Sequence, residues 1–199
     1  MEKLENSLMP KLAVIPLDIP EVLLITPQRF KDNRGYFTET YQATDFAELG
    51  IRCSFVQDNQ ALSIPTNTVR GLHFQRPPMS QAKLVRVLRG RIFDAVVDIR
   101  RGSPTYGRWC AATLTAEGGE QLFVPHGFAH SYCTLEPNTE VFYKVDNLYS
   151  KECDGGVLWN DPTIGISWPI AERDAILSEK DRNLPLLVNF NTPFQALGV

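Results

Sequence analysis

The chain has 199 residues, of which 43% are hydrophobic and 22% are charged, and its formal net charge is −3 at pH 7. This composition is typical of a globular protein with a packed core. The charge gives no general attraction to nucleic acid or to an anionic membrane surface. No run approaches the roughly 18 apolar residues that a membrane helix needs. Any acidic ligand must therefore meet cations that are gathered in one pocket.

The cysteines and the amino terminus indicate a compartment. Cys53, Cys110, Cys133 and Cys153 lie far apart and form no CxxC pair, which predicts neither disulfides nor a thiolate metal site. The amino-terminal segment lacks the apolar core and the cleavage site of a secretory signal. Together these features favour a reducing, cytoplasmic location.

The predicted elements begin with one short helix in "TDFAELG", with Thr44 as its N-cap and Gly50 just past its end. Strand signals dominate the rest of the chain. "KLVRVLRGRIFDAVVDIR" predicts two strands around a turn at Arg89 and Gly90. "RWCAATLT", "EQLFVP", "HSYCTL" and "EVFYKV" follow, separated by turn-forming residues. This short spacing favours a sandwich or a closed barrel over alternating helices and strands.

The domain organisation is expected to be simple, because no repeat, charge block or flexible linker divides the chain. We expect one domain over residues 1–199, with its core at about 24–170. Residues 171–199 are expected to form a loop and a short helix that cover this core.

One motif indicates a fold family. "GEQLFVPHGFAH" contains the pattern G-x5-P-x-G-x2-H, which runs from Gly119 to His130. It resembles the second motif of the cupin superfamily, whose all-β fold is a double-stranded β-helix, or jelly roll. Metal-binding cupins add two histidines and a glutamate from an earlier strand, where this chain offers only His73, while His126 lies on a turn. Too few ligands remain for a stable transition-metal site, so no metal or other cofactor is expected.

Several polar side chains in the predicted strands have two interpretations. Strand alternation places Gln57 and Asn59 on one face of "SFVQDNQ", where they serve either a ligand or the backbone at a sheet end. Tyr143 is either a reactive acid or a core aromatic residue with its hydroxyl at a rim. Position by position, the structural interpretation is the simpler one. The same holds for Arg34, Arg70, Lys83 and His73.

Arg70 and His73 pose a geometric problem within "RGLHFQ". Strict alternation places them on opposite faces of their strand. If both serve one pocket, either Arg70 lies at the strand entrance or Gly71 forms a bulge.

The motifs "DNRGYFTE", "FVQDNQ", "VRGLHFQ", "FVPHGFAH", "FYKVDNLYS" and "LSEKD" occur in this order between about residues 24 and 185. Taken together, they resemble the dTDP-4-dehydrorhamnose 3,5-epimerase family. The resemblance implies a metal-free jelly-roll enzyme that converts dTDP-4-keto-6-deoxy-D-glucose to dTDP-4-keto-L-rhamnose by inverting two carbons beside a ketone. It also implies a homodimer. The alternative is a mono-epimerase that acts on one carbon of a related nucleotide sugar.

The resemblance also implies catalytic roles. His73 is the base that takes a proton next to the ketone, and Asp181 orients and stabilises its ring. Tyr143 is the acid on the opposite face, and Lys83 lies near the enolate oxygen. Asp181 has a competing local interpretation, because Ser178-x-x-Asp181 is also a capping box that opens a short helix.

Binding roles are implied in the same way. Arg34 and Arg70 match positions that meet the diphosphate, since guanidinium groups suit phosphate oxygens. Phe30 and Glu39 match positions around the nucleotide base. Three further residues match positions around the sugar: Gln57, Asn59 and His130. In the family, the arginine-bearing amino-terminal segment is shared between subunits.

Two residues depart from the usual family pattern, and two other protein classes remain as alternatives to the epimerase. Leu148 stands where many relatives carry a second tyrosine, and Asp154 stands where a longer acidic residue is common. Both bear on nucleotide preference and on whether one or two carbons are inverted. A binding protein without catalysis would predict a broken set of His73, Asp181 and Tyr143. A metal-dependent oxygenase would need more ligands.

Overall fold

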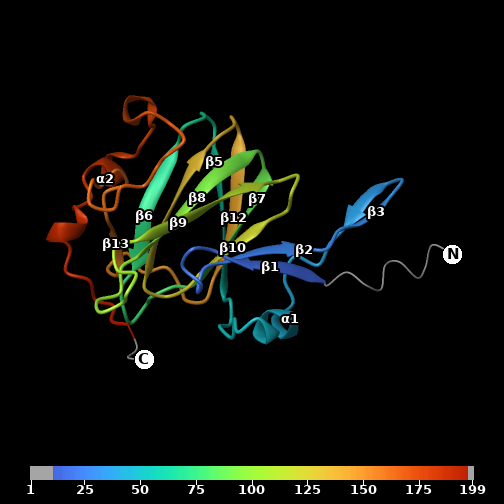
Figure 1. Cartoon of the computed structure of the whole chain (residues 1–199). Helices are drawn as coiled ribbons and strands as arrows, with labels where there is room; N and C mark the ends of the chain where they lie inside the picture. The colour runs from blue at the N-terminus through green and yellow to red at the C-terminus, as the bar shows by residue number, and fades with distance from the viewer. Residues whose placement is uncertain (1–10, 197–199) are drawn as a thin grey trace.

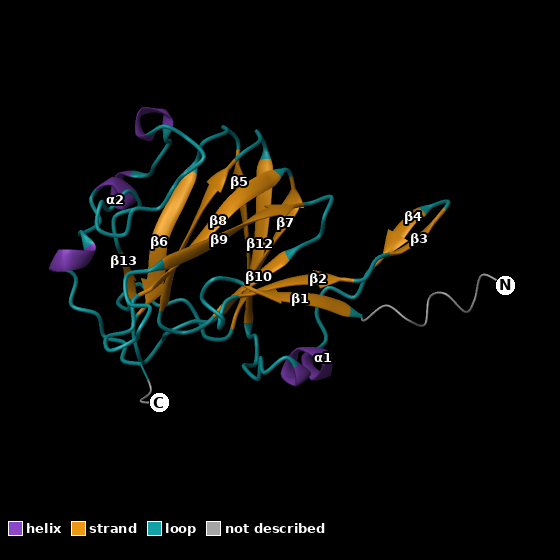
Figure 2. Cartoon of the chain, in the orientation of Figure 1, coloured by secondary structure: helices purple, strands orange, loops and turns teal. Residues whose placement is uncertain are grey.

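Two antiparallel β-sheets pack face to face in a computed structural model of the protein, which describes residues 11–196 (Figures 1 and 2). The first sheet has six strands in the spatial order β1 (Leu12–Pro16), β2 (Leu23–Pro27), β10 (Gln121–Val124), β7 (Lys83–Arg89), β12 (Thr139–Val145) and β5 (Gln57–Ser63). The second sheet has the order β13 (Asp154–Gly156), β6 (Val69–Gln75), β11 (Phe128–Thr134), β8 (Arg91–Asp98) and β9 (Trp109–Thr115).

The remaining elements are short. β3 (Phe30–Asp32) and β4 (Gly35–Phe37) form a separate hairpin that projects from the sandwich (Figure 2). The helices are α1 (Ala43–Glu48) and α2 (Glu179–Arg182), with 3-10 turns η2 (Glu172–Asp174) and η3 (Leu187–Asn189). Within residues 11–196, no helix is long and apolar enough to cross a membrane. The expectation of an all-β, cupin-type jelly roll with a few short helices is confirmed.

The turn at Gly90 joins the two sheets. β7 pairs with β10 and β12, whereas β8 pairs with β11 and β9, so the two predicted strands are not a hairpin. Gly90 has a φ of +80°, and a Cβ there would collide with Thr139. The chain therefore crosses between the sheets at a position that only glycine fits well.

Apolar side chains from both sheets fill the space between them. Val85 and Val141 from the first sheet and Ile92, Val96 and Leu114 from the second are at most 1% exposed and belong to one cluster. Each side chain of this kind contributes about 1.5–3 kcal/mol when it leaves water. This cluster borders the polar cleft described below, because Tyr132 belongs to both.

Helix α1 begins two residues earlier than the predicted N-cap implies. Its N-cap is Gln42, whose side chain accepts a hydrogen bond from the Asp45 amide at 2.9 Å, so the prediction of Thr44 as N-cap was wrong. Gly50 follows the helix with a φ of +85°, as expected for a residue after a helix end. The helix is held by Phe46, which is buried in a cluster with Leu84 on the outer face of the first sheet.

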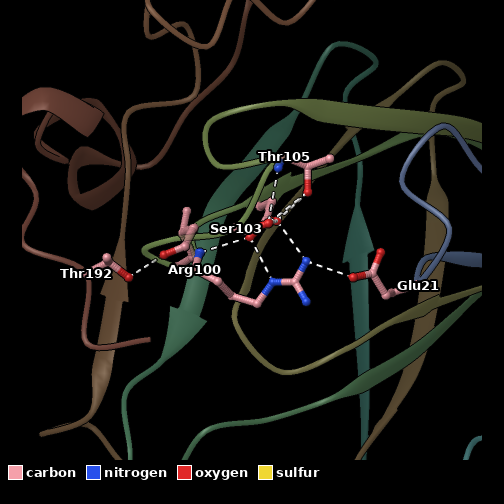
Figure 3. Close-up of polar contacts among 7 residues, drawn as sticks. Glu21, Arg100, Ser103, Thr105 and Thr192 are labelled. Carbon is pink, nitrogen blue, oxygen red and sulfur yellow. Dashed lines mark hydrogen bonds and ion pairs between the residues drawn. The ribbon is translucent and has the colours of Figure 1, made fainter. Parts of the chain in front are cut away.

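The end of β8 is fixed by a buried carboxylate. Asp98 is fully buried and accepts hydrogen bonds from Arg100, Ser103 and Thr105. Burial would raise the pKa of Asp98, but these hydrogen bonds outweigh it and hold the pKa below its usual value. Arg100 also reaches Glu21, and Thr192 donates to the carbonyl of the residue that follows Asp98 (Figure 3). This network joins the turn after β8 to the carboxyl-terminal segment.

The carboxyl-terminal segment runs along the second sheet. Thr68 and Ile176 form a parallel bridge, and the Val69 amide donates to the Ile176 carbonyl at 2.9 Å. This pairing places α2 beside β6, although the two are more than 100 residues apart in the chain.

Candidate active site

A cavity of about 480 Å³ opens between the two sheets. β5, β7 and β12 supply one wall, β6 and β11 supply the other, and residues 176–181 cover one side. A neighbouring hollow of about 210 Å³ shares His73, Lys83, Tyr143 and Lys180 with it. The two spaces therefore form a single cleft.

Most of the predicted site residues line this cleft, and three do not. All four proposed catalytic residues, together with Arg70, His130, Gln57 and Asn59, are on its walls. Phe30 and Arg34 lie on the projecting β3–β4 hairpin, where both are exposed, and Arg34 is paired with Asp32 at 2.6 Å. Glu39 is also exposed and lies outside the cleft of this chain.

A bulge at Gly71 brings Arg70 and His73 to the same space. His73 pairs with His130 on β11, whereas Arg70 pairs with Tyr132, so β6 contains one more residue than β11 between these two pairs. Gly71 has a φ of +127°, and a Cβ there would lie 2.5 Å from the His130 carbonyl oxygen. Strict alternation is thereby interrupted, and the bulge that the sequence allowed is confirmed.

His73 and Asp181 form a hydrogen-bonded pair across two elements. Nε2 of His73 lies 2.6 Å from Oδ1 of Asp181, and the two side chains are 30% and 5% exposed. The Asp181 amide separately donates to Ser178 Oγ at 3.1 Å, so the capping interaction uses the backbone and leaves the carboxylate free for His73. Burial would raise the pKa of Asp181, but hydrogen bonds from His73 and Ser178 hold it below its usual value.

Lys83 begins β7 on the opposite wall. Its Nζ lies 3.4 Å from the His73 carbonyl oxygen. Burial lowers the pKa of Lys83 to about 8, and the negative charges of Asp94 and Asp154 limit the shift. The ammonium group is therefore a cation near neutral pH that has lost much of its hydration.

Tyr143 lies on β12, opposite Asn59 of β5. Burial raises the pKa of Tyr143, and the positive charge of Arg70 opposes this shift only in part. The phenol therefore keeps its proton at neutral pH, which suits an acid rather than a base. It belongs to the sheet opposite the one that carries His73.

His130 is half of a second pair, with Asp94 of β8. Nε2 of His130 lies 2.6 Å from Oδ1 of Asp94, and the side chains are 7% and 0% exposed. Burial lowers the pKa of His130 although Asp94 opposes the shift. Within residues 11–196, the second oxygen of Asp94 has no hydrogen-bond partner. Sequence analysis missed Asp94, whose signal was a carboxylate inside the otherwise apolar run of β8.

The third histidine lies elsewhere. His126 contacts Ser80 Oγ at 2.9 Å and Asp146 Oδ2 at 2.7 Å, and it does not line the cleft. Each histidine thus pairs with a different aspartate. Among the described residues, no group of three or more His, Cys, Asp or Glu side chains is arranged to hold a metal ion.

Three further cleft residues were not among the predicted site residues. Lys180, next to Asp181 in "LSEKD", contacts Asp154 of β13. Tyr149 lines the cleft, and its hydroxyl lies 3.5 Å from the same Asp154 carboxylate. Of the two departures, Asp154 therefore lies in the cleft, whereas Leu148 is 57% exposed and outside it.

Comparison with known proteins gives consistent results. A family model described as dTDP-4-dehydrorhamnose 3,5-epimerase matches residues 16–189. A protein of that description from Sinorhizobium fredii is 49% identical over 183 residues, which cover 92% of this chain and 93% of the relative. The solved structure from Bacillus anthracis, with TDP and PPi bound, has a TM-score of 0.85 at 48% identity and covers 88% of this chain and 99% of its own.

A second solved structure contains a sugar nucleotide. It is dTDP-6-deoxy-D-glucose-3,5-epimerase from Legionella pneumophila in complex with dTDP-4-keto-L-rhamnose. Its TM-score is 0.86 at 39% identity, and the match covers 90% of this chain and 95% of that chain.

Proposed function

The chain belongs to the dTDP-4-dehydrorhamnose 3,5-epimerase family and is an isomerase; on that premise, we propose that it converts dTDP-4-keto-6-deoxy-D-glucose to dTDP-4-keto-L-rhamnose by inverting carbons 3 and 5. One observation carries the proposal: a single cleft has a histidine, paired with an aspartate of α2, on one sheet, and a half-buried tyrosine and a partly dehydrated lysine on the other. The sugar nucleotide bound by the Legionella relative supports the choice of substrate.

His73 is the proposed base. Because its Nε2 faces the Asp181 carboxylate, the neutral ring carries its proton there and keeps a lone pair on Nδ1. Nδ1 removes the proton from the carbon next to the ketone, and the imidazolium that forms is stabilised by the negative charge of Asp181. The low pKa of Asp181 keeps this carboxylate ionised throughout.

Lys83 is the proposed stabiliser of the enolate. When the proton leaves, negative charge develops on the ketone oxygen, and a cation held close to it lowers the barrier. The attraction is strong because Lys83 is already partly dehydrated, so little water must be reorganised during the step.

Tyr143 is the proposed acid. Inversion requires the new proton to arrive from the face opposite the base, and Tyr143 belongs to the sheet opposite β6. Burial keeps its hydroxyl protonated at neutral pH. We assign Arg70 to the diphosphate and three residues to the sugar: Gln57, Asn59 and His130.

We further propose a cytoplasmic homodimer in which the β3–β4 hairpin completes the cleft of the partner. The hairpin carries Phe30 and Arg34 and projects away from the sandwich, and neither residue lines the cleft of its own chain (Figure 2). Glu39, which follows the hairpin, belongs to the same proposed nucleotide contact. The four cysteines are free thiols, the form that a reducing compartment maintains.

The dimer proposal is tested by mixing His73→Ala, which lacks the base, with Arg34→Ala, which should bind the diphosphate weakly, at a substrate concentration so low that neither variant alone turns over. If the hairpin serves the partner's cleft, a mixed dimer contains one cleft with both His73 and Arg34, and activity returns. If mixing restores no activity although sedimentation shows that subunits exchange, the hairpin does not serve the partner.

The activity is tested by a proton NMR time course with dTDP-4-keto-6-deoxy-D-glucose in deuterated water. Exchange of the protons on carbons 3 and 5, with formation of dTDP-4-keto-L-rhamnose, is the expected result. Exchange at a single carbon would establish the mono-epimerase alternative. If neither proton exchanges, the proposed substrate is wrong.

A further inference from the structure

The side chain of Arg70 connects the two sheets at the cleft. Arg70 belongs to β6, yet its Nε donates to Ser63 Oγ on β5 at 3.1 Å, and its Nη2 donates to the Leu62 carbonyl oxygen at 3.2 Å. β5 and β6 lie in different sheets. The exposed guanidinium is therefore held by the opposite wall rather than by its own strand.

Ser63 is placed for this contact by strand alternation. It is the last residue of β5 and is 3% exposed, whereas Leu62 and Ile64 on either side of it are exposed. Its inward neighbour at the next alternate position, Ala61, lines the cleft. A buried hydroxyl is costly without a partner, and Arg70 supplies one.

The two hydrogen bonds use one edge of the guanidinium group. Nε and Nη2 together form its side edge, and both donate to β5. Nη1 makes no hydrogen bond to any residue between 11 and 196. The outer edge, formed by Nη1 and the second proton of Nη2, is left available. Two parallel N–H groups on this edge match two oxygens of a phosphate group.

We propose that Ser63 is a positioning residue: it fixes the side edge of the Arg70 guanidinium so that the outer edge faces the diphosphate of the substrate. The inference rests on the proposed function, because it takes the ligand at Arg70 to be a diphosphate. Ser63 does not touch the ligand. It lowers the cost of binding by ordering a long side chain before the ligand arrives.

The matched control is Ser131 on β11. It is also fully buried, and its Oγ has no hydrogen-bond partner within the described part of the chain. Ser131→Ala therefore removes a buried serine hydroxyl without removing a contact to Arg70. Ser63→Thr keeps the hydroxyl and is the rescue variant.

The experiment measures binding of inorganic pyrophosphate by calorimetry, together with KM and kcat for the sugar nucleotide. We expect Ser63→Ala to raise both the pyrophosphate Kd and KM by about tenfold, as for a lost hydrogen bond to a charged group. We expect kcat to stay within roughly twofold of wild type, because the diphosphate contact acts in the ground and transition states alike. Ser63→Thr and Ser131→Ala should both bind pyrophosphate as wild type does.

A double-mutant cycle separates positioning from a general loss of structure. In an Arg70→Ala background, Ser63→Ala should cause no further loss of pyrophosphate binding. An equal loss in both backgrounds, or an unchanged Kd in the single variant, would overturn the proposal. If Ser63→Ala does not fold, Ser63→Cys retains most of the volume with only a weak acceptor and must show the same loss.

Pyrophosphate contains no sugar, so this cycle is independent of turnover. Coupling between Ser63 and Arg70 in an enzyme that leaves the sugar nucleotide unchanged would support the positioning role and reject the proposed function. Full epimerase activity without coupling would reject the positioning role alone.

Discussion

Two histidine–aspartate pairs, His73–Asp181 and His130–Asp94, each place their histidine in the wall of the cleft, and they have the same separation but differ in access. Both pairs have a nitrogen–oxygen distance of 2.6 Å. The His73 side chain is 30% exposed, whereas that of His130 is 7% exposed and its partner is fully buried. Burial lowers the pKa of His130, which disfavours the imidazolium that a base must become.

A short hydrogen bond to a carboxylate therefore does not by itself identify a base. A proton acceptor needs both a carboxylate that stabilises its charged form and an open path to the substrate. His73 has both, since it lines the cleft and its Nε2 contacts the Asp181 carboxylate. His130 has a carboxylate but little access, which suits a fixed hydrogen-bonding group in the wall.

The largest effect on kcat is expected when the His73–Asp181 pair is broken. His73→Ala removes the base, and kcat should fall by about 10³-fold while the fold remains intact. His130→Ala should lower kcat far less. Its main effect should be to destabilise the protein by roughly 1–3 kcal/mol, because the buried Asp94 loses its partner. Steady-state kinetics measures kcat, and urea unfolding measures the free energy of unfolding. Activity of His73→Ala at a tenth of wild type or more would remove it as the base.

The next effect concerns the wall that faces His73. Tyr143→Phe keeps the ring and removes the acidic proton, so inversion should slow by about 10²-fold. Exchange of a carbon-bound proton with deuterated water should continue, because His73 still removes it. NMR distinguishes exchange from inversion, and complete epimerisation by this variant would refute the acid assignment.

Lys83 should impose an alkaline limit on activity. Its pKa is lowered to about 8, so its charge and its stabilisation of the enolate are present below this pH and lost as the pH rises through it. The wild-type kcat should therefore fall above about pH 8. Lys83→Ala should lower kcat by about 10²-fold at neutral pH and abolish this alkaline limb of the pH profile, the fall in kcat above about pH 8. Lys83→Arg keeps its charge and should shift the limb upwards. An unchanged profile in Lys83→Arg would assign the limb to another group.

Asp181→Asn removes the negative charge beside His73 but keeps a side chain of the same size. The amide cannot stabilise the imidazolium of His73, so kcat should fall by about 10–10²-fold. The helix cap should survive because it uses the backbone amide. Folding lowers the pKa of Asp181, so its stabilising effect is present above the ordinary carboxyl pKa of 3.8 and is lost as the pH falls through the lower pKa of the folded state. Thermal unfolding between neutral and acid pH should show a smaller loss in Asp181→Asn than in wild type.

The smallest effect should come from the pair outside the cleft. His126 contacts Asp146 at 2.7 Å but does not line the cavity. His126→Ala should therefore leave kcat and KM within roughly twofold of wild type. A loss as large as that of His73→Ala would show that proximity to a carboxylate, rather than access to the cleft, decides the role of a histidine here.

Local patterns in the sequence determined much of the architecture. Alternating apolar residues and turn formers located the strands from β7 to β12, and the glycine at position 90 located the turn between β7 and β8. The motifs "RGLHFQ", "FYKV" and "LSEKD" carried the proposed catalytic set because each retains its reactive residue in a recognisable setting. The predicted N-cap of α1 was wrong. Thr44 and Gln42 are both polar, and only the path of the backbone decides which side chain reaches a free amide of the first helical turn.

Only the tertiary structure decided how these pieces meet. Periodicity describes a single strand, whereas sheet membership depends on pairing between distant segments, which is why β7 and β8 were not assigned to different sheets. The bulge at Gly71 is set by its fit against β11, and it places Arg70 beside His73. Asp181 reaches His73 across 108 positions while its amide caps α2, a division of labour between backbone and side chain that a linear motif does not specify. Sequence patterns record local conformational preference, and the cleft is made of contacts whose geometry exists only after the chain has closed on itself.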